Sequence, residues 1–412
     1  MYIDIKCRNM EIIPRPKYID LIVARLNKGM IIILIGQRRV GKSYLLRLLH
    51  EWILANRKDV NVAYINKELM NFSQITDSNE LYNYVTTILP EGGENYLLID
   101  EVQDIEGYEV ALRSLQAEDR CQIVATGSNA YIFSTELSTR LAGRYIEIPI
   151  YSLGYNEFLI FNNLKDSEQA LISYLRVGGL PGLCHFDIDD EAQVRDYHQG
   201  VYNTIMMRDV IAREQIRNVA FIENLAKYIA DNIGKLTSPG NIAKVMKSHG
   251  EAISDPVVIN YLRYLVKALI LREVARYDIR GKKIFEHNFK YYFSDHGLRN
   301  YLCGYNLRGS VEKIIENVVF NHLMMQGFDV KVGILRAGEV DFIATRGAHT
   351  IYIQVTYLLG SDETISREFG NLAAIKDNYP KYVVSMDPVS GQLPEYPGIN
   401  HVSLREFLLT EL

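Results

Sequence analysis

The sequence is poor in the residues that build disulfide frameworks, zinc sites and membrane spans. Its four cysteines in 412 residues lie far apart, and no two have the spacing of a metal site or a disulfide framework. This usage fits a reducing cytosol. The most continuous apolar run, Met30–Ile35, is about a third of a membrane span. We therefore expect a protein without membrane-spanning helices.

A signal peptide and a strong excess of basic charge are also missing. The first ten residues include Asp4, Lys6 and Arg8 and so lack the apolar stretch of a secretory signal. The net charge is −5 and the pI is about 6.0, which argues against a uniformly basic nucleic-acid binder but leaves a local basic patch open. We find no internal repeat or low-complexity tract. A soluble, cytoplasmic protein is the expectation.

The order of apolar patterns predicts three regions, which we place at 1–150, 151–306 and 307–412. In the first region short apolar strands alternate with amphipathic helices, and this alternation is typical of a parallel sheet in an α/β fold. The expected strands are Met30–Ile35, Val60–Ile65, Tyr96–Ile99, Gln122–Ala125 and Tyr145–Ile148.

The segment from Gly36 to Ser43 matches the phosphate-binding pattern G-x-x-x-x-G-K-[ST], with an apolar strand before it and a helix after it. Its glycines permit a close backbone approach to phosphates at a helix N-terminus. Lys42 is expected to reach the β- and γ-phosphates of ATP, and the Ser43 hydroxyl to bind Mg²⁺. The expected nucleotide-binding residues are Gly36, Arg39, Val40, Gly41, Lys42, Ser43 and Tyr44.

An acidic pair follows the buried strand that begins at Tyr96. The carboxyl edge of a parallel sheet is where α/β proteins bind ligands. Asp100 is therefore expected to hold Mg²⁺, and Glu101 to orient and deprotonate the attacking water. Taken alone, such a pair is more often a solvated turn. Its position about sixty residues after the phosphate-binding loop favours the catalytic interpretation.

Two further elements complete the expected site. The strand that begins at Gln122 ends in small polar residues, so Ser128 or Asn129 is expected to face the γ-phosphate, with simple turn chemistry as the alternative. Arg140 or Arg144, just before the last strand, is a candidate to stabilise transition-state charge in a neighbouring subunit. A surface salt bridge is the alternative for either arginine.

These four elements, in this order, resemble the AAA+ ATPases of the P-loop class. The phosphate-binding segment and the run from Leu141 to Phe158 resemble a prokaryotic branch of that class, and the resemblance covers essentially the whole chain. It implies ATP and Mg²⁺ as cofactors, a winged-helix segment and a C-terminal domain of unknown function.

The middle region is similar to that winged helix. A helical segment from Asn241, a second one after Ser254, and a strand–turn–strand around Asp278 have the expected order. Basic side chains there are candidates for phosphate contacts with nucleic acid, but winged helices are also protein-contact modules. These side chains are Arg263, Lys267, Arg280, Lys282 and Lys283.

The last region resembles the restriction-endonuclease-like fold. An active member needs a helix acid, a strand aspartate and an acid-x-lysine pair on the next strand. Glu316 and Asp341 match the first two, but Gln354 and Thr356 stand in place of the second acid and the lysine. We therefore expect a retained scaffold that has lost one metal ligand and its only cation, and so does not cleave nucleic acid.

The leading hypothesis is an ATP hydrolase whose nucleotide state repositions the other regions, acting as a homo-oligomer or on a protein client. One rival is an ATPase that acts on DNA or RNA in genome defence or mobile-element biology, with the winged helix as its contact. A second rival is a scaffold that binds ATP and turns it over rarely.

Overall fold

The computed structural model describes residues 13–128, 141, 143–248, 253–336, 338–388 and 390–412. The chain forms two compact units, residues 1–150 and residues 151–412. We call them the N-terminal unit and the C-terminal unit and describe each by itself.

A five-stranded sheet with the order β2-β3-β4-β1-β5 forms the centre of the N-terminal unit. All its neighbouring strands are parallel, which confirms the predicted α/β fold of a P-loop protein. The strands are β1 (Ile31–Ile35), β2 (Val60–Asn66), β3 (Glu94–Asp100), β4 (Gln122–Gly127) and β5 (Tyr145–Pro149). β1 is buried along its whole length, as expected of a central strand covered on both faces.

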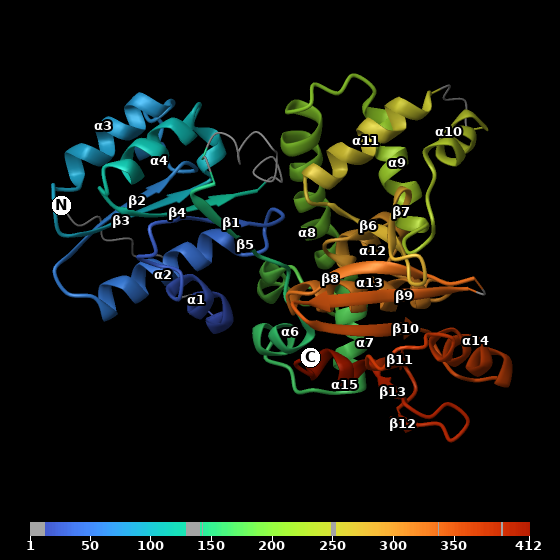
Figure 1. The fold of residues 1–412 in the computed structure, drawn as a ribbon. Coiled ribbons are helices and arrows are strands. Elements are labelled where there is room, and N and C mark those ends of the chain that lie inside the picture. Colours follow the sequence, from blue (N-terminus) through green and yellow to red (C-terminus); the bar gives the residue numbers. More distant parts are fainter. Residues whose placement is uncertain (1–12, 129–140, 142, 249–252, 337, 389) are drawn as a thin grey trace. The chain divides into compact units, whose positions relative to one another are not determined.

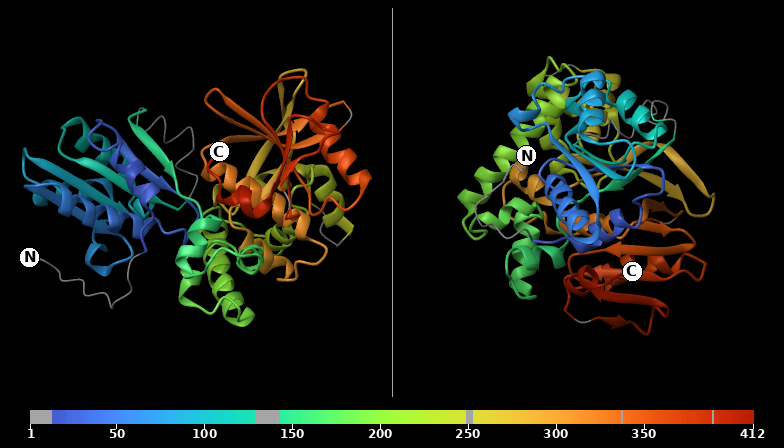
Figure 2. Two further views of the ribbon diagram at one scale, coloured as in Figure 1. Left: turned by 90° about the horizontal axis from the view of Figure 1, so that it is seen from below. Right: turned by 90° about the vertical axis from the view of Figure 1, so that its left-hand side faces the viewer.

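Helices cover both faces of this sheet. α1 and α2 lie against one face, and α3 and α4 lie against the other (Figures 1 and 2). An Asp77–Glu80 capping box starts α3, and its buried Leu81 and Val85 face inward. The helices are α1 (Pro16–Val23), α2 (Lys42–Asn56), α3 (Ser78–Ile88) and α4 (Tyr108–Ala117), with 3₁₀ turns at Met70–Phe72 and Val102–Asp104.

The register of the sheet decides which loops meet. Ala125 of β4 is level with Ile33 of β1 on one side and with Ile99 of β3 on the other. Because the three strands are parallel, the segments that follow them emerge at the same edge of the sheet. The phosphate-binding loop, the Asp100–Glu101 pair and the end of β4 are therefore neighbours.

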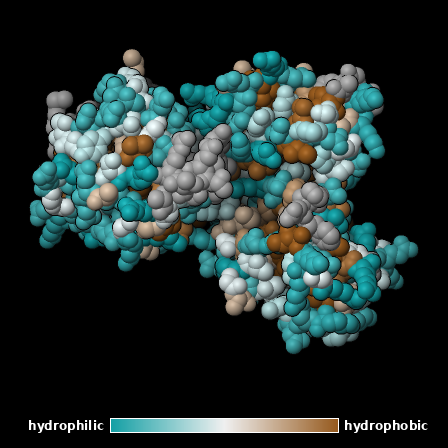
Figure 3. Space-filling model, turned by 45° about the horizontal axis from the view of Figure 1, so that its top comes forward, coloured by the Kyte–Doolittle hydropathy of each residue, from teal (hydrophilic) through white to brown (hydrophobic). Residues whose placement is uncertain are grey.

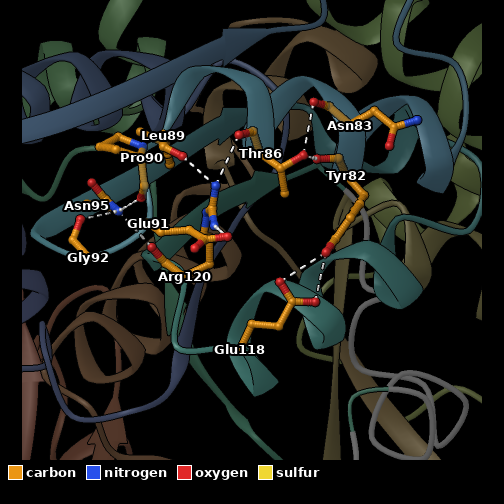
Figure 4. Close-up of polar contacts among 10 residues, drawn as sticks. All are labelled: Tyr82, Asn83, Thr86, Leu89, Pro90, Glu91, Gly92, Asn95, Glu118 and Arg120. Carbon is orange, nitrogen blue, oxygen red and sulfur yellow. Dashed lines mark hydrogen bonds and ion pairs between the residues drawn. The ribbon is translucent and has the colours of Figure 1, made fainter.

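The opposite edge of the sheet is fixed by Arg120 and Asn95 (Figure 4). Arg120 donates to the carbonyls of Thr86 and Leu89 at 3.1 and 2.8 Å, so it fixes the end of α3. Asn95 donates to the carbonyls of Pro90 and Arg120 at 2.9 and 3.0 Å. These bonds brace the amino ends of β3 and β4 and leave the carboxyl edge to the site.

The C-terminal unit begins with helices and ends in a mixed sheet with the order β12-β13-β11-β10-β9-β8-β6-β7. Its helices are α6 (Tyr155–Phe161), α7 (Glu168–Val177), α8 (Glu191–Thr204), α9 (Val219–Asp231), α10 (Pro239–Ser248), α11 (Asp255–Lys267), α12 (His296–Cys303), α13 (Val311–Met325), α14 (Asp362–Ala373) and α15 (Leu404–Leu409), with a π-helical segment at Ile205–Ala212 and a 3₁₀ helix at Pro181–His185. Its strands are β6 (Leu271–Asp278), β7 (Lys283–Phe293), β8 (Asp329–Ile334), β9 (Glu339–Arg346), β10 (His349–Val355), β11 (Lys381–Ser385), β12 (Gly391–Gln392) and β13 (Ile399–Ser403).

The β6–β7 hairpin, which the sequence analysis assigned to a wing, is part of this sheet. β6 pairs with β8 in parallel through Arg276–Asp278 and Val332–Ile334. The boundary expected at 306 therefore lies inside the C-terminal unit, and sheet pairing crosses it.

Helix α13 is bound to the same hairpin. The Asn317 side chain accepts from the backbone N–H of Phe293 and donates to the carbonyl of Phe293, both at 2.8 Å. On a different part of the sheet, α14 buries Phe369 and Leu372 in an apolar cluster with Val340 of β9. α13 therefore brings its polar residues to β7 and α14 closes the apolar core.

Large apolar side chains are exposed at several places on the surface. Met70, Ile160, Met207 and Ile284 are the most exposed of them, and the face shown in Figure 3 is mostly hydrophilic with dispersed apolar residues. Within the described part of the chain, no helix has both the length and the apolar character needed to cross a membrane.

Candidate functional site

The phosphate-binding loop has a strained backbone between β1 and α2. Arg39 and Gly41 have φ angles of +68° and +96°, in the left-handed region. A Cβ on Gly36 would lie 2.3 Å from the carbonyl oxygen of Ile150, so a side chain does not fit there. Gly41 is also the residue before the first turn of α2, so the N–H groups of that turn face the loop. This is the backbone arrangement that cradles phosphates.

Lys42 is buried within this loop. Its Nζ donates to the carbonyl oxygens of Gly36 and Gln37 at 2.8 and 3.0 Å. The carbonyl of Val40 accepts from Arg15, which precedes α1, at 3.0 Å. The ammonium group is thus held inside the loop, and two backbone carbonyl oxygens are among its partners.

Asp100 ends β3 and is completely buried. Its Oδ1 accepts from the Thr126 hydroxyl at 2.6 Å, and its Oδ2 is buried without a hydrogen bond of ordinary geometry in the described chain. Burial raises the pKa of this carboxyl, while the hydroxyls of Thr126 and Ser43 and the charge of Lys42 oppose the rise. A buried carboxylate oxygen without a hydrogen bond of ordinary geometry, beside the Ser43 hydroxyl, is suited to bind a cation.

Glu101 follows with a φ angle of +56°, an uncommon backbone conformation for a glutamate. Its N–H donates to the Thr126 hydroxyl at 2.9 Å, and its Oε2 accepts from Ser128 at 3.0 Å and from Gln103. Burial alone would raise the pKa of Glu101, but Lys42, Arg38 and these two hydrogen bonds outweigh it and lower the pKa. The carboxylate is therefore charged at neutral pH.

The other residues predicted for the site differ in position. Ser43 lies half-buried in the first turn of α2, and Tyr44 is 43 % exposed beside Arg47. Arg144 is exposed at the amino end of β5, roughly 15 Å along the sheet from the phosphate-binding loop. Asn129 and Arg140 lie outside the described residues.

Residues that contact the site but were absent from the predicted set include Arg15, Gln103 and Thr126, and the charge of Arg38 also acts on Glu101. Thr126 stands two residues before Ser128 on the same strand end, and Gln103 two residues after Glu101. The strand-end position was therefore available as a signal for both. Arg15 lies 25 positions before Val40, and nothing local in the sequence marks it.

In the C-terminal unit the structure brings Glu316, Asp341 and Gln354 together. The Gln354 side chain accepts from the N–H of Asp341 at 3.3 Å. The expectation that this group has no cation is wrong, because Lys290 of β7 lies 3.2 Å from Glu316 and 3.8 Å from Asp341. It was missed because it comes from a strand well before both acids in the sequence.

Two family models match the chain. Residues 28–159 match an AAA domain, and residues 168–308 match a domain of unknown function. An uncharacterized protein of Haemophilus influenzae is 31% identical over 380 residues, which cover 90% of this chain and 93% of that protein. An uncharacterized protein of Methanocaldococcus jannaschii is 29% identical, covering 90% of this chain and 84% of its own length.

Solved structures with some similarity include those of DnaA and ORC1 proteins. AMPPCP-bound DnaA from Aquifex aeolicus is 16% identical, covers 61% of this chain and 86% of its own, and has a TM-score of 0.32. The Aeropyrum pernix ORC1 protein in complex with DNA is 14% identical, covers 70% of this chain and 92% of its own, and has a TM-score of 0.32. Neither likeness is close enough to assign a function.

Proposed function

We propose that this chain, which belongs to the same family as the Haemophilus influenzae protein and contains an AAA domain, binds ATP with Mg²⁺ and hydrolyses it. One observation carries the proposal. Lys42, Asp100 and Glu101 come from two separate segments, and the parallel sheet places all three at one edge, buried and within electrostatic reach of one another.

The residues at this edge fit Mg²⁺ bound together with a nucleotide. Ser43 and Asp100 offer hard oxygen ligands, and Asp100 Oδ2 has no hydrogen bond of ordinary geometry in the described chain. Mg²⁺ usually keeps several waters and takes phosphate oxygens as further ligands, so two protein groups suffice. When bound, the ion neutralises charge on the phosphates.

Lys42 would bind the β- and γ-phosphates after giving up its bonds to the carbonyls of Gly36 and Gln37. Glu101 would accept the proton of the attacking water through Oε1, while Ser128 and Gln103 hold Oε2 in place. Its lowered pKa keeps the base ionised at neutral pH.

The nucleotide state would then switch the conformation of a homo-oligomer or of a complex with a client protein. The position of Arg144 supports an oligomer, since it lies at the sheet edge opposite its own phosphate-binding loop and would act only on a neighbour's nucleotide. Arg140 is the other candidate for this role.

The test is ATP binding and turnover by the full chain and by two variants. Lys42→Ala removes the positive charge that would contact the phosphates. It should weaken ATP binding by about 100-fold or more, since two charge-assisted hydrogen bonds are lost. Arg120→Ala is a matched control, because it alters the opposite sheet edge and should leave affinity unchanged in the folded fraction. Equal affinity of wild type and Lys42→Ala would exclude the proposed site.

A second candidate function is nucleic-acid contact by the β6–β7 hairpin. Arg280, Lys282 and Lys283 are exposed at its turn, whereas Lys267 lies 3.7 Å from Glu214. Retention of DNA that falls steeply with salt, and falls further in an Arg280→Ala/Lys282→Ala/Lys283→Ala variant, would support it. Salt-independent or absent retention would leave the protein-client alternative.

A further inference from the structure

A buried lysine of the C-terminal unit lies among three carboxylates. Lys290 Nζ is 2.6 Å from Glu339 Oε1, 3.2 Å from Glu316 Oε1 and 3.8 Å from Asp341 Oδ1. Its side chain is 4% exposed. Glu316 comes from α13 and the other two acids come from β9, so the ammonium group connects β7 to both elements. We call these four residues the Lys290 cluster.

Fixed donors also orient the carboxylates of the cluster. The Tyr292 hydroxyl donates to Glu316 Oε1 at 2.6 Å, and the Val355 N–H donates to Asp341 Oδ2 at 2.8 Å. Three carboxylates lie within 4 Å of this ammonium group, and those of Glu339 and Glu316 are at hydrogen-bonding distance. The geometry is that of an ion-pair network with its own cation, not of an open coordination site.

Charge and burial agree with this description. Burial would lower the pKa of Lys290, but Glu316, Asp341 and Glu339 overcome that effect and raise the pKa, so the ammonium keeps its proton. Burial, followed by the charge of Glu316, raises the pKa of Asp341. The charge of Glu368 on α14 acts on Asp341 in the same direction. Carboxylates this close together repel one another when charged unless a cation lies between them, and Lys290 supplies that cation.

The resemblance to restriction-endonuclease-like domains implies a divalent ion held by Glu316 and Asp341, and the residues do not fit one. Within the described residues, no group of three or more His, Cys, Asp or Glu side chains has the geometry to hold a metal. An ammonium already lies between the two acids, and the position of a further acid ligand is taken by Gln354.

We propose that the Lys290 ammonium is a built-in cation that takes the place of a divalent metal ion between α13, β9 and β7. The C-terminal unit then needs no metal to hold these elements together. Glu316 and Asp341 are stabilising partners of Lys290 and not metal ligands. This proposal does not depend on ATP hydrolysis by the N-terminal unit.

The proposal predicts that removing the lysine creates a metal site. Lys290→Met leaves three carboxylates around a space that a cation occupied. Their oxygens lie 2.6–3.8 Å from the Nζ position, and Ca²⁺ takes oxygen ligands at about 2.3–2.6 Å in irregular geometry, whereas Mg²⁺ demands about 2.0–2.1 Å in a regular octahedron. Small rotations would suit Ca²⁺ better than Mg²⁺. Mn²⁺ takes the same kind of oxygen ligands and can be counted by its spectroscopic signal.

The experiment counts Mn²⁺ bound per full-length chain by electron paramagnetic resonance, without nucleotide. Wild type and Asp341→Asn should bind equal amounts of Mn²⁺. Lys290→Met should bind one additional ion per chain, and Lys290→Met/Asp341→Asn should lose it. Lys381→Met is the matched control, because this buried lysine contacts the carbonyls of Asp377 and Tyr379 and a single carboxylate. It should gain no ion.

Two results would overturn the proposal. One is an ion bound by wild type and lost in Asp341→Asn, which would make the acids metal ligands despite Lys290. The other is a folded Lys290→Met that gains no ion. If Lys290→Met unfolds without metal, recovery of its fold by Mn²⁺ or Ca²⁺ supports the proposal and failure of both ions to restore it counts against it. Whether or not Lys290→Met folds, the amounts of Mn²⁺ bound by wild type and by Asp341→Asn can still be compared.

Discussion

Both units contain a buried lysine near carboxylates, but the two ammonium groups have different close partners. Lys42 donates to two backbone carbonyls of its own loop, at 2.8 and 3.0 Å. Lys290 lies within 4 Å of three carboxylates from two other elements. A phosphate can replace neutral carbonyls and gain a charge-assisted bond. It would have to displace full charges to reach Lys290.

The difference suggests how the role of a buried lysine, ligand binding or fold stabilisation, can be inferred from the groups around it. Near Lys42, Asp100 keeps one oxygen without a hydrogen bond in the described chain, and Glu101 has strained backbone. Around Lys290 the acids have donors on several sides. Buried polar groups without hydrogen bonds, together with backbone strain, indicate a ligand-binding site. Buried polar groups that all have hydrogen-bond partners indicate a structural network.

The largest expected effect tests the catalytic side of this comparison. Glu101→Gln should keep ATP binding, because the phosphate contacts remain, and should lower kcat by a factor on the order of 10²–10⁴, because the general base is lost. Single-turnover hydrolysis, measured together with ATP affinity, separates the two quantities. Turnover at the unmutated rate would show that Glu101 is not the base.

The next effect concerns stability. Lys290→Met leaves buried carboxylates without their cation and should cost the C-terminal unit roughly 3 kcal/mol or more. Lys42→Met should cost the N-terminal unit less, since the hydrogen bonds of Lys42 to Gly36 and Gln37 go to backbone carbonyls that carry no net charge. Denaturant unfolding in the absence of divalent cations, followed separately for each unit, measures both. If both variants lost the same free energy of unfolding, the distinction between the two lysines would not hold.

Local patterns were enough to predict the sheet and the glycine-containing loop between β1 and α2. The phosphate-binding segment combines a strand, a fixed glycine spacing and a helix within about twenty residues, and the expected strand Tyr96–Ile99 lies inside the observed β3. Residues that depend on strand pairing were harder to predict. Thr126 contacts Asp100 only because β4 lies beside β3, a neighbour relation that no local pattern states.

The Lys290 cluster shows where prediction from local patterns stops. Lys290 precedes Glu316 by 26 residues, and β7 reaches it through a hairpin whose other strand pairs with β8. The strand–turn–strand was predictable from the sequence, since turn residues and apolar alternation are local signals. The pairing of β6 with β8 across the expected boundary was not, because pairing between distant strands leaves no comparable trace.

A moderate effect is expected from subunit mixing. Turnover per chain should rise with protein concentration if Arg144 serves the nucleotide of a neighbour. Arg144→Ala and Lys42→Ala chains, each inactive alone, should recover part of the activity when mixed, because one mixed interface keeps both groups. Arg113→Ala, which changes an exposed arginine of α4, is the control. Constant specific activity in a protein shown to be monomeric would exclude this role.

The last prediction is that no activity will be seen: the C-terminal unit should not cleave nucleic acid. Wild type would be incubated with linear, circular and single-stranded DNA in Mg²⁺ or Mn²⁺, with and without ATP. Gln354 and Thr356 stand where the resemblance to restriction-endonuclease-like domains calls for an acid and a lysine. Although Lys290 supplies a positive charge, its partners are the same carboxylates that a metal would need. Lys290→Met should also stay inactive, because a metal bound in that variant would lack a neighbouring cation for the charged intermediate. Cleavage by wild type that is lost in Asp341→Ala would show that the cluster is a working nuclease site and that Lys290 belongs to its chemistry.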